Sequence, residues 1–255
     1  YTNGGFEDGI TGWLKTSAVT LTAETNDVYA GRGAMRIERP AYGYYLNTPL
    51  PKLSADKKYL HSTAIKLAND ETAFESGTSI FFDGDLKTAA IERYDENGPV
   101  QAFGKVTKSW NRHFETIVPS APSEVKAFYT AWTGEPTIII DDMYVGELVV
   151  SDVVYNGETD LKIPFDDGAK NEYTLSASLV NQFGFSQGLE GESLAYSLCD
   201  EYEGVALTDN VLEISDLATV GEIKLDITAN PAFNTDYGSV KKTVRLKLDA
   251  DWESK

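Results

Sequence analysis

Few residues of this chain have the types and spacing that catalysis requires. The sequence of 255 residues contains two histidines, His61 and His113, and a single cysteine, Cys199, which we expect to be a small buried hydrophobe. Hydrolysis of a glycosidic bond needs two carboxyl groups that flank the bond. Asp83-Gly84-Asp85 has the acid-x-acid spacing but is interpreted as a turn. The chain has no GxSxG, HExxH, phosphate-loop or dinucleotide motif, so the sequence indicates a protein that is not an enzyme.

Aromatic residues provide the second kind of chemistry, which is stacking against the apolar face of a sugar ring. In the segment 125–132, alternation places Lys126, Phe128, Thr130 and Trp132 on the more polar face of a strand. Trp132 is therefore the first candidate for a stacking platform, and the alternative is that it belongs to the core.

Two tyrosines and two polar residues complete the candidate sugar site. Tyr42 and Tyr44 are separated by one glycine and share a strand face, which makes them the second candidate platform. The alternative is an edge strand with ordinary β propensity. Arg93 and Gln101 are candidate partners for sugar hydroxyl groups, and they flank a loop whose path the sequence does not define.

Short β-branched or aromatic runs bounded by Gly, Pro, Asn or Asp recur along the whole chain. No apolar stripe with helical period continues for three turns. Many short strands without helices are typical of sandwiches, barrels and jelly rolls, so we predict an all-β fold. Strands are expected at 19–23, 34–38, 59–67, 78–82, 113–118, 125–132, 137–145, 173–179, 194–198, 211–214, 222–228 and 240–248.

The charge of the chain limits its partners. It has 40 acidic and 22 basic residues and a net charge of −18, which repels nucleic acid and anionic membranes. No apolar run approaches the roughly 18–20 residues that span a bilayer. A single cysteine forms no disulfide within the chain, which is compatible with an extracellular location in many bacterial proteins. We therefore expect neither a nucleic acid nor a membrane as partner.

A domain boundary is expected near Val150. A strand ends just before this residue, and another begins near Val153 and leads to a turn at Asn156-Gly157. The chain also becomes more acidic after this point, and no Pro-rich or Ser-rich linker separates the halves. We predict two domains, residues 1–149 and 150–255, joined by a short and fairly stiff junction.

The first domain carries an ordered series of motifs. They are Asn3-Gly4-Gly5-Phe6-Glu7, Gly12-Trp13, Gly31, Trp110 and the apolar run that ends in Asp141-Asp142. In that order, over about 145 residues, the series resembles the galactose-binding-like jelly-roll carbohydrate-binding modules, in particular the group with families 4, 9, 16 and 22. The resemblance implies a two-sheet antiparallel jelly roll, in which we interpret both Trp13 and Trp110 as structural.

The same resemblance implies a structural calcium ion that ties the N-terminal segment to the last strand of the module. Glu7 matches the glutamate of the family and Asp141 its late aspartate, and carbonyls near Val28 and Gly31 are the expected backbone ligands. Calcium takes about six to eight oxygen ligands, which suits this set. Asp142 is a weaker candidate, because it points to the opposite face if the strand is regular. The alternative is that Glu7 and Asp141 are solvated turn acids.

The second domain resembles the bacterial immunoglobulin-like modules of secreted multidomain enzymes. The resemblance rests on Tyr173–Ala177, Asn181–Gly184, Ala195–Leu198 and Val220–Ile223, and on about seven short strands in about 100 residues. It implies an immunoglobulin-like β-sandwich that acts as a spacer. Asp166-Asp167 is interpreted as a solvated turn rather than as a weak calcium site.

Together these resemblances imply a non-catalytic carbohydrate-binding fragment of a secreted, bacterial, multidomain glycan-degrading enzyme. A glycoside hydrolase or polysaccharide lyase would be attached, the partner would be a polysaccharide or oligosaccharide, and the location would be extracellular or at the cell surface. The fragment itself is expected to be a monomer. The alternative is a structural spacer or adhesin fragment of a bacterial cell-surface protein with no sugar site, which burial of Tyr42, Tyr44 and Trp132 would favour.

Overall fold

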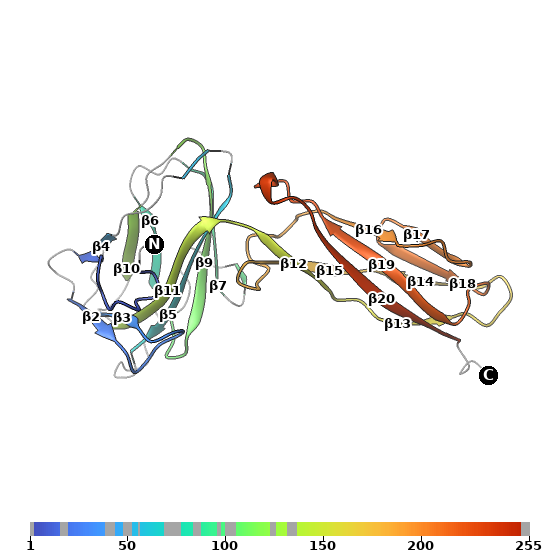
Figure 1. Ribbon diagram of the computed structural model, residues 1–255, viewed down its shortest axis with the longest axis horizontal. Coiled ribbons are helices and arrows are strands. Elements are labelled where there is room, and N and C mark those ends of the chain that lie inside the picture. The colour runs from blue at the N-terminus through green and yellow to red at the C-terminus, as the bar shows by residue number, and fades with distance from the viewer. Residues whose placement is uncertain are drawn as a thin grey trace. The chain divides into compact units, whose positions relative to one another are not determined.

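The computed structural model of the chain contains twenty strands and one short 3-10 helix, η1 (Thr235–Tyr237), among the residues it describes (Figure 1). Their contacts divide the chain into two compact units, Tyr1–Leu148 and Val149–Lys255. No helix formed by the described residues is long and apolar enough to cross a membrane. The structure describes residues 3–15, 20–38, 44–47, 53–55, 57–68, 78–83, 88–95, 98–99, 106–122, 126–131 and 137–250.

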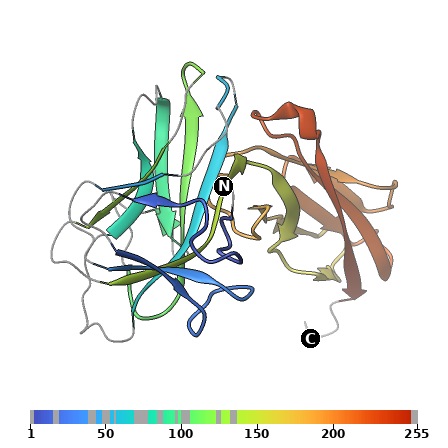
Figure 2. The same ribbon diagram turned by 60° about the vertical axis from the view of Figure 1, so that its left-hand side comes forward.

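The first unit is built from two antiparallel sheets, seen from two directions in Figures 1 and 2. The chain passes from one sheet to the other at β1–β2, β3–β4, β4–β5, β5–β6, β6–β7, β9–β10 and β10–β11. The larger sheet has the order β2 (Thr20–Glu24), β3 (Ala34–Glu38), β11 (Ile138–Glu147), β5 (Tyr59–Leu67), β9 (Asn111–Pro119), β7 (Thr88–Asp95) and β8 (Gly98–Pro99). The smaller sheet has the order β1 (Leu14–Lys15), β4 (Tyr44–Asn47), β10 (Lys126–Ala131) and β6 (Thr78–Asp83).

Repeated passage between two antiparallel sheets is the arrangement of a jelly-roll sandwich, so the fold class predicted for the first unit is confirmed. Its core lies on one face of the larger sheet. Ile65 and Leu67 of β5 pack there with Ile138 and Ile140 of β11, and Phe6 joins them from the N-terminal segment. All nine residues of β5 are buried, so the opposite face of this strand is covered as well.

The second unit forms a sandwich from shorter strands. β12 (Val150–Tyr155) pairs with β15 (Ala177–Asn181), and β14 (Lys170–Thr174) pairs with β18 (Val211–Ser215), which also pairs with β17 (Val205–Thr208). The other sheet has the order β13 (Asp160–Ile163), β20 (Val240–Ala250), β19 (Gly221–Ala229) and β16 (Leu194–Leu198), with β13 parallel to β20.

This strand order is compatible with the immunoglobulin-like sandwich that the sequence predicts. If β14 and β15 are taken as two halves of one strand, one sheet has the order A-B-E-D and the other carries C, F and G, as in constant-type immunoglobulin domains. The core contains Leu161, Leu179, Leu212, Leu225 and Leu246, all at most 5% exposed. The Cys–Trp–Cys signature is absent from the sequence, so aliphatic packing holds these two sheets together.

Two expectations for the second unit were wrong. The single strand expected at 173–179 is interrupted at Leu175, whose N–H donates to Asn210 O at 2.7 Å, and the chain then changes partner from β18 to β12. Cys199 is exposed rather than buried. In β16 the half-buried positions are Leu194, Tyr196 and Leu198, so alternation turns Cys199 to the outer face of the sheet.

Candidate functional site

The loop between β2 and β3 is held by two carboxylates that are distant in sequence. Asp141 of β11 accepts hydrogen bonds at Oδ2 from the N–H groups of Tyr29 and Ala30, at 2.9 and 3.0 Å. Glu7 accepts the Arg32 N–H at Oε1 (2.8 Å) and the Arg32 Nε–H at Oε2 (3.2 Å). The N-terminal segment and the last strand of the jelly roll therefore meet at this loop.

The two carboxylates differ in their electrostatic environment. Asp141 has 0% exposure, and desolvation raises its pKa although the N–H groups of Ala30, Asp142 and Tyr29 favour its charged form. Hydrogen bonds from the backbone and side chain of Arg32 lower the pKa of Glu7. Asp141 is thus a buried carboxyl group whose charged form is disfavoured by desolvation, and a cation beside it would favour that form.

Two glycines let the N-terminal segment approach the loop. A Cβ on Gly31, which has φ +66°, would lie 1.9 Å from Glu7 Oε1. A Cβ on Gly33 would lie 2.2 Å from Phe6 O. These contacts leave room only for hydrogen at both positions, so the loop and the segment with Glu7 fit together because these residues are glycines.

The donors at this loop are of the kind that calcium takes. Glu7 and Asp141 have carboxylate oxygens at this loop, and Val28 and Gly31 lie in the same loop, so the role of all four as ligands stays a prediction. No group of three or more His, Cys, Asp or Glu side chains that could hold a metal ion occurs in the described part of the chain. A calcium ion here would therefore need backbone carbonyls and water in addition to the two acids.

Asp142 was expected to point to the face opposite Asp141 if the strand is regular, but the strand is irregular at this residue. It has φ +44° and lies in an irregularity of the β11–β5 register between Asp141 and Tyr144. Its carboxylate pairs with the guanidinium of Arg112, which also donates to Ser62 Oγ at 2.8 Å. The bulge thus turns Asp142 toward β9 rather than simply to the face opposite Asp141.

The predicted sugar-binding residues fall on different parts of the jelly roll. Tyr44 begins β4 in the smaller sheet, whereas Arg93 lies in β7 of the larger sheet, in register with Glu115. Tyr42, Gln101 and Trp132 lie outside the described residues. The structure therefore does not bring Tyr44 and Arg93 together in one sheet, and their roles stay predictions.

The register of the smaller sheet reveals an aromatic row that the sequence pattern did not. Tyr45 of β4, Phe128 of β10 and Phe81 of β6 are register partners across three neighbouring strands. Two residues along the strands in each direction, Lys126 is in register with Asp83 and Thr130 with Ser79. Because side chains alternate between the faces, these residues belong to the same face as the aromatic row.

Tyr44 belongs to the other face of the same sheet. It is in register with Tyr129 and Ile80, and the next row on that face is Leu46, Ala127 and Phe82. Lys15 is in register with Leu46 and Thr78 with Ala131, so this face carries polar as well as apolar residues. The row of Tyr45, Phe128 and Phe81 is taken as the candidate ligand surface because all three of its register partners are aromatic.

A buried histidine–carboxylate pair lies on the inner face of the larger sheet. His61 Nδ1 is 3.2 Å from Glu115 Oε2, and the ring's Nε2 is 3.4 Å from Thr63 Oγ1. His61 and Glu115 are 1% and 3% exposed. A polymer does not reach groups buried to this extent, so the pair serves the packing of the jelly roll rather than chemistry on a glycan.

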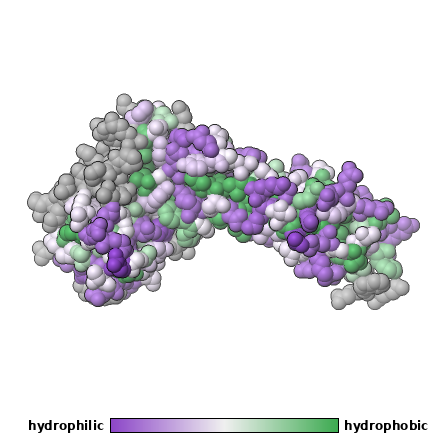
Figure 3. Space-filling view, viewed as in Figure 1, coloured by the Kyte–Doolittle hydropathy of each residue, from purple (hydrophilic) through white to green (hydrophobic). Residues whose placement is uncertain are grey.

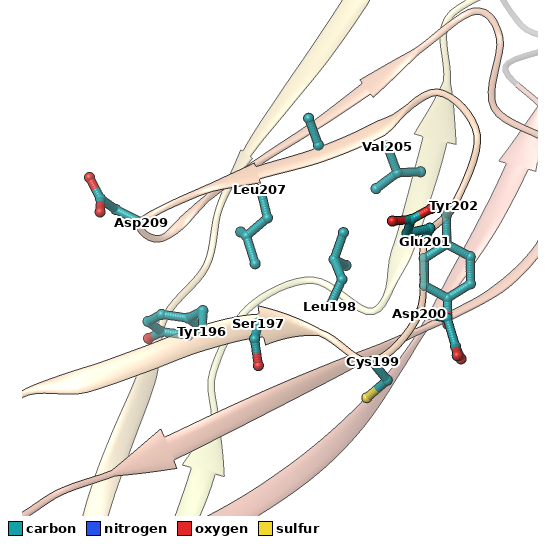
Figure 4. Close-up of a pocket in the computed structure, with 11 residues that line it drawn as sticks. Tyr196, Ser197, Leu198, Cys199, Asp200, Glu201, Tyr202, Val205, Leu207 and Asp209 are labelled. Carbon is teal, nitrogen blue, oxygen red and sulfur yellow. The ribbon is translucent and has the colours of Figure 1, made fainter.

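A hollow of about 710 Å³ opens in the second unit between β16 and β17, which are the edge strands of the two sheets (Figure 4). Leu198, Val205 and Leu207 point into it, whereas the sulfur of Cys199 points away (Figure 4). These side chains are half-buried members of the sandwich core. The hollow is thus the open edge of the sandwich.

The second unit also exposes hydrophobic side chains on its turns. Phe165 is 58% exposed, Leu217 65% and Val220 64%. Gly168 N–H donates to Asp216 Oδ2 at 3.0 Å and Asp216 N–H to Ala169 O at 3.3 Å, so the two turns that carry these residues lie side by side. Elsewhere, hydrophilic residues cover much of the visible face of this unit (Figure 3).

No protein-family model and no curated protein matches the chain. Among solved structures, the CBM22-1 xylan-binding domain from Paenibacillus barcinonensis Xyn10C is 16% identical, with 56% of this chain and 91% of that chain covered and a TM-score of 0.42. The tandem CBM22-1–CBM22-2 domain of the same protein is 14% identical, with 88% and 62% covered and a TM-score of 0.42. TmCBM61 in complex with β-1,4-galactotriose is 16% identical, with 58% and 97% covered and a TM-score of 0.37. Similarity at this level does not establish a family or a ligand for the chain.

Proposed function

We propose that the first unit binds a neutral polysaccharide and has no catalytic role. The observation that carries this proposal is the register row of Tyr45, Phe128 and Phe81 across three strands of the smaller sheet. Neighbouring strands lie about 4.8 Å apart, so the row extends over about 10 Å. Aromatic residues spaced in this way suit the apolar faces of consecutive sugar rings, and the adjacent rows supply groups that hydrogen-bond to hydroxyls.

The charge of the chain favours a neutral glycan. A net charge of −18 repels polyuronates such as pectin, whereas an uncharged chain of sugars pays no such electrostatic cost. A shallow and solvated site retains little free energy after desolvation, so each site should bind with a Kd on the order of micromolar to millimolar.

The wider role follows from this binding. We infer a secreted, bacterial protein in which this fragment holds a glycan-degrading catalytic domain on its polysaccharide and thereby raises the local concentration of that domain. The immunoglobulin-like unit acts as a spacer. Its acidic, largely hydrophilic surface suits an extracellular module that stays in solution as a monomer.

We also propose that a structural calcium ion binds at the loop between β2 and β3. Glu7, Asp141 and the carbonyls near Val28 and Gly31 would hold the ion. The support for this proposal is the buried carboxyl group of Asp141 beside the loop that Glu7 also contacts. When bound, the ion would favour the charged form of that group and join the N-terminal segment to β11.

Binding should be measured by affinity electrophoresis and calorimetry with xylan, mannan, β-glucan and galactan, and with pectin as the acidic comparison. We expect at least one neutral polysaccharide to bind. Tyr45→Ala and Trp132→Ala should each weaken binding roughly tenfold, because a stacked ring contributes about 1–1.5 kcal/mol. Tyr237→Ala is the control, since Tyr237 is 55% exposed in the second unit.

The outcome distinguishes the proposal from its alternative. If a correctly folded protein binds none of the neutral polysaccharides in the presence of calcium, the proposed function is wrong. The fragment would then be a structural spacer or adhesin module without a sugar site. Retained affinity in both variants would instead show that the aromatic row is not the binding surface.

A further inference from the structure

A second pair of aromatic rings lies on the outer face of the larger sheet, away from the aromatic row of the smaller sheet. Tyr29 comes from the loop between β2 and β3, and Trp110 directly precedes β9. Their ring centroids are 5.7 Å apart with an interplanar angle of 66°. Tyr29 is 37% exposed and Trp110 is half-buried against Ala34, Ala68 and Ile139. The two rings form one continuous aromatic surface that is open to solvent.

Two buried cations support these rings from the sheet. The Arg112 guanidinium carbon is 4.8 Å from the centroid of the Tyr29 ring, and Lys66 Nζ is 5.8 Å from the Trp110 ring. Arg112 is 2% exposed and Lys66 is 5% exposed. Because β9 and β5 carry these side chains on the outer face of the sheet, each ring is fixed from below by a cation–π contact.

Each cation is in turn paired with an acid at the side of the aromatic surface. Lys66 Nζ contacts Asp27 Oδ2, and Arg112 contacts the carboxylate of Asp142. The Asp142 side chain is 42% exposed and that of Asp27 is 22% exposed. The local charges therefore cancel, while carboxylate oxygens that accept hydrogen bonds stay within reach of solvent beside the rings.

The backbone around this surface is held in a costly conformation. Asp142 has φ +44° at the β-bulge of β11, a region that side chains other than glycine rarely adopt. Such conformations occur preferentially at functional sites. Asp141 also fixes the N–H of Tyr29 at 2.9 Å, so the loop that carries this ring is fixed on the same strand as Asp142.

We propose that Tyr29 and Trp110, with Asp142 and Asp27 beside them, form a second sugar-binding surface for a neutral glycan. The rings cover the apolar face of one sugar residue, and the two carboxylates accept hydrogen bonds from its hydroxyl groups. The rigid support beneath the rings lowers the entropic cost of binding. This surface shares the ligand class of the proposed function but uses a different sheet and different residues, and it assigns a ligand contact to Trp110, which the sequence pattern marked as structural.

The test is an NMR titration of the full chain with xylohexaose, cellohexaose and mannohexaose, in which the four indole N–H signals are assigned by Trp→Phe variants. We expect the signal of Trp110 to shift with at least one oligosaccharide. Tyr29→Ala should reduce the affinity measured at Trp110 about tenfold, and Asp142→Asn about threefold. Tyr29→Trp should retain binding, which separates loss of a contact from loss of the loop. Tyr237→Ala should change nothing.

The possible results separate this inference from the proposed function. If the signal of Trp132 or the resonances of β4 and β10 shift while Trp110 stays unchanged, the second surface does not bind sugar and the proposed function stands. If Trp110 shifts equally in the wild type and in Tyr29→Ala, the aromatic surface is not the contact and the inference is wrong. If no signal responds to any oligosaccharide or soluble neutral polysaccharide, both proposals fail.

Discussion

At the scale of single residues, the pKa of a side chain in this protein depends on the residues that it contacts in the fold. Asp226 of β19 accepts hydrogen bonds from Lys241 and from the Thr243 hydroxyl (2.6 Å), both on β20. These contacts lower its pKa from an ordinary value of 3.8 to about 2. Charged Asp226 therefore stabilises the folded state above pH about 4, and this contribution is lost as the pH falls toward 2.

Asp226→Asn should therefore make the second unit less sensitive to acid. The free energy of unfolding of the wild type should decrease between pH 4 and pH 2 more steeply than that of the variant, because asparagine has no proton to take up. Urea denaturation at several pH values in this range measures the difference. Asp166→Asn, at an exposed turn, is the matched control. Identical slopes for wild type and Asp226→Asn would contradict the assignment.

Sequence motifs identified some of the candidate ligand-binding residues but not all of them. Glu7 and Asp141 were identifiable from their motifs, and the structure places both at the loop that contains Val28 and Gly31. Tyr29 was not identifiable as a candidate, because a tyrosine in a turn carries no periodic signal. Its significance depends on Trp110 and Arg112, which are about 80 residues away in the sequence and reach it only when β9 pairs with β5.

At the scale of elements, the turn that joins β16 to β17, and so connects the two sheets of the second unit, requires a glycine. Gly204 has φ +70°, and a Cβ there would lie 2.3 Å from Ala218 N. Its carbonyl accepts the Ser215 N–H at 2.8 Å. The turn is therefore packed directly against the backbone that follows β18.

Gly204→Ala should cost about 2–4 kcal/mol of stability, because backbone strain and a clash with the Ala218 backbone add together. Gly191→Ala should cost only about 1 kcal/mol, because Gly191 has φ +78° but nothing within 4 Å of its Cβ position. Chemical denaturation measures the free energy of unfolding of both variants, and the difference between their losses of stability is the cost of the clash with Ala218. Equal costs would show that the turn can move away from Ala218.

Strand prediction succeeded where the apolar pattern was continuous. The expected strands 34–38 and 59–67 coincide with β3 and β5. The pattern missed β7, β13 and β17, whose short runs mix apolar and polar residues on sheet edges or beside them. It also joined β14 and β15, because the interruption occurs at Leu175, whose N–H donates to the carbonyl of Asn210, far away in the sequence.

At the scale of the whole molecule, each unit has its own buried core, so the two should unfold in separate transitions. Calcium should raise the melting temperature of the first unit only, by about 5–10 °C at a hundredfold excess over Kd, where binding contributes about 2.7 kcal/mol. A chelator should reverse the shift, and Asp141→Asn should abolish it. Differential scanning calorimetry of the full chain measures both transitions.

The calorimetric controls decide between calcium and a general ionic effect. Magnesium at the same concentration should give a smaller shift, because it demands a tighter octahedral set of ligands than a loop of carbonyls supplies. If calcium shifts both transitions equally, or if Asp141→Asn responds as the wild type does, the structural calcium site is wrong. The glycan-binding proposals do not depend on this outcome.

The sequence by itself determined the all-β fold class and predicted a boundary near Val150, and its motif order singled out Glu7 and Asp141 through the resemblance to jelly-roll modules. These are local properties, since alternation, turn residues and motif order are all readable along the chain. Only the tertiary structure decided which aromatic residues share a row or a surface. The register of β4, β10 and β6 aligns Tyr45 with Phe128 and Phe81, and the bulge in β11 turns Asp142 toward Arg112. Register shifts and bulges arise from contacts between strands far apart in the sequence, and a change of one residue moves a side chain to the other face of the sheet.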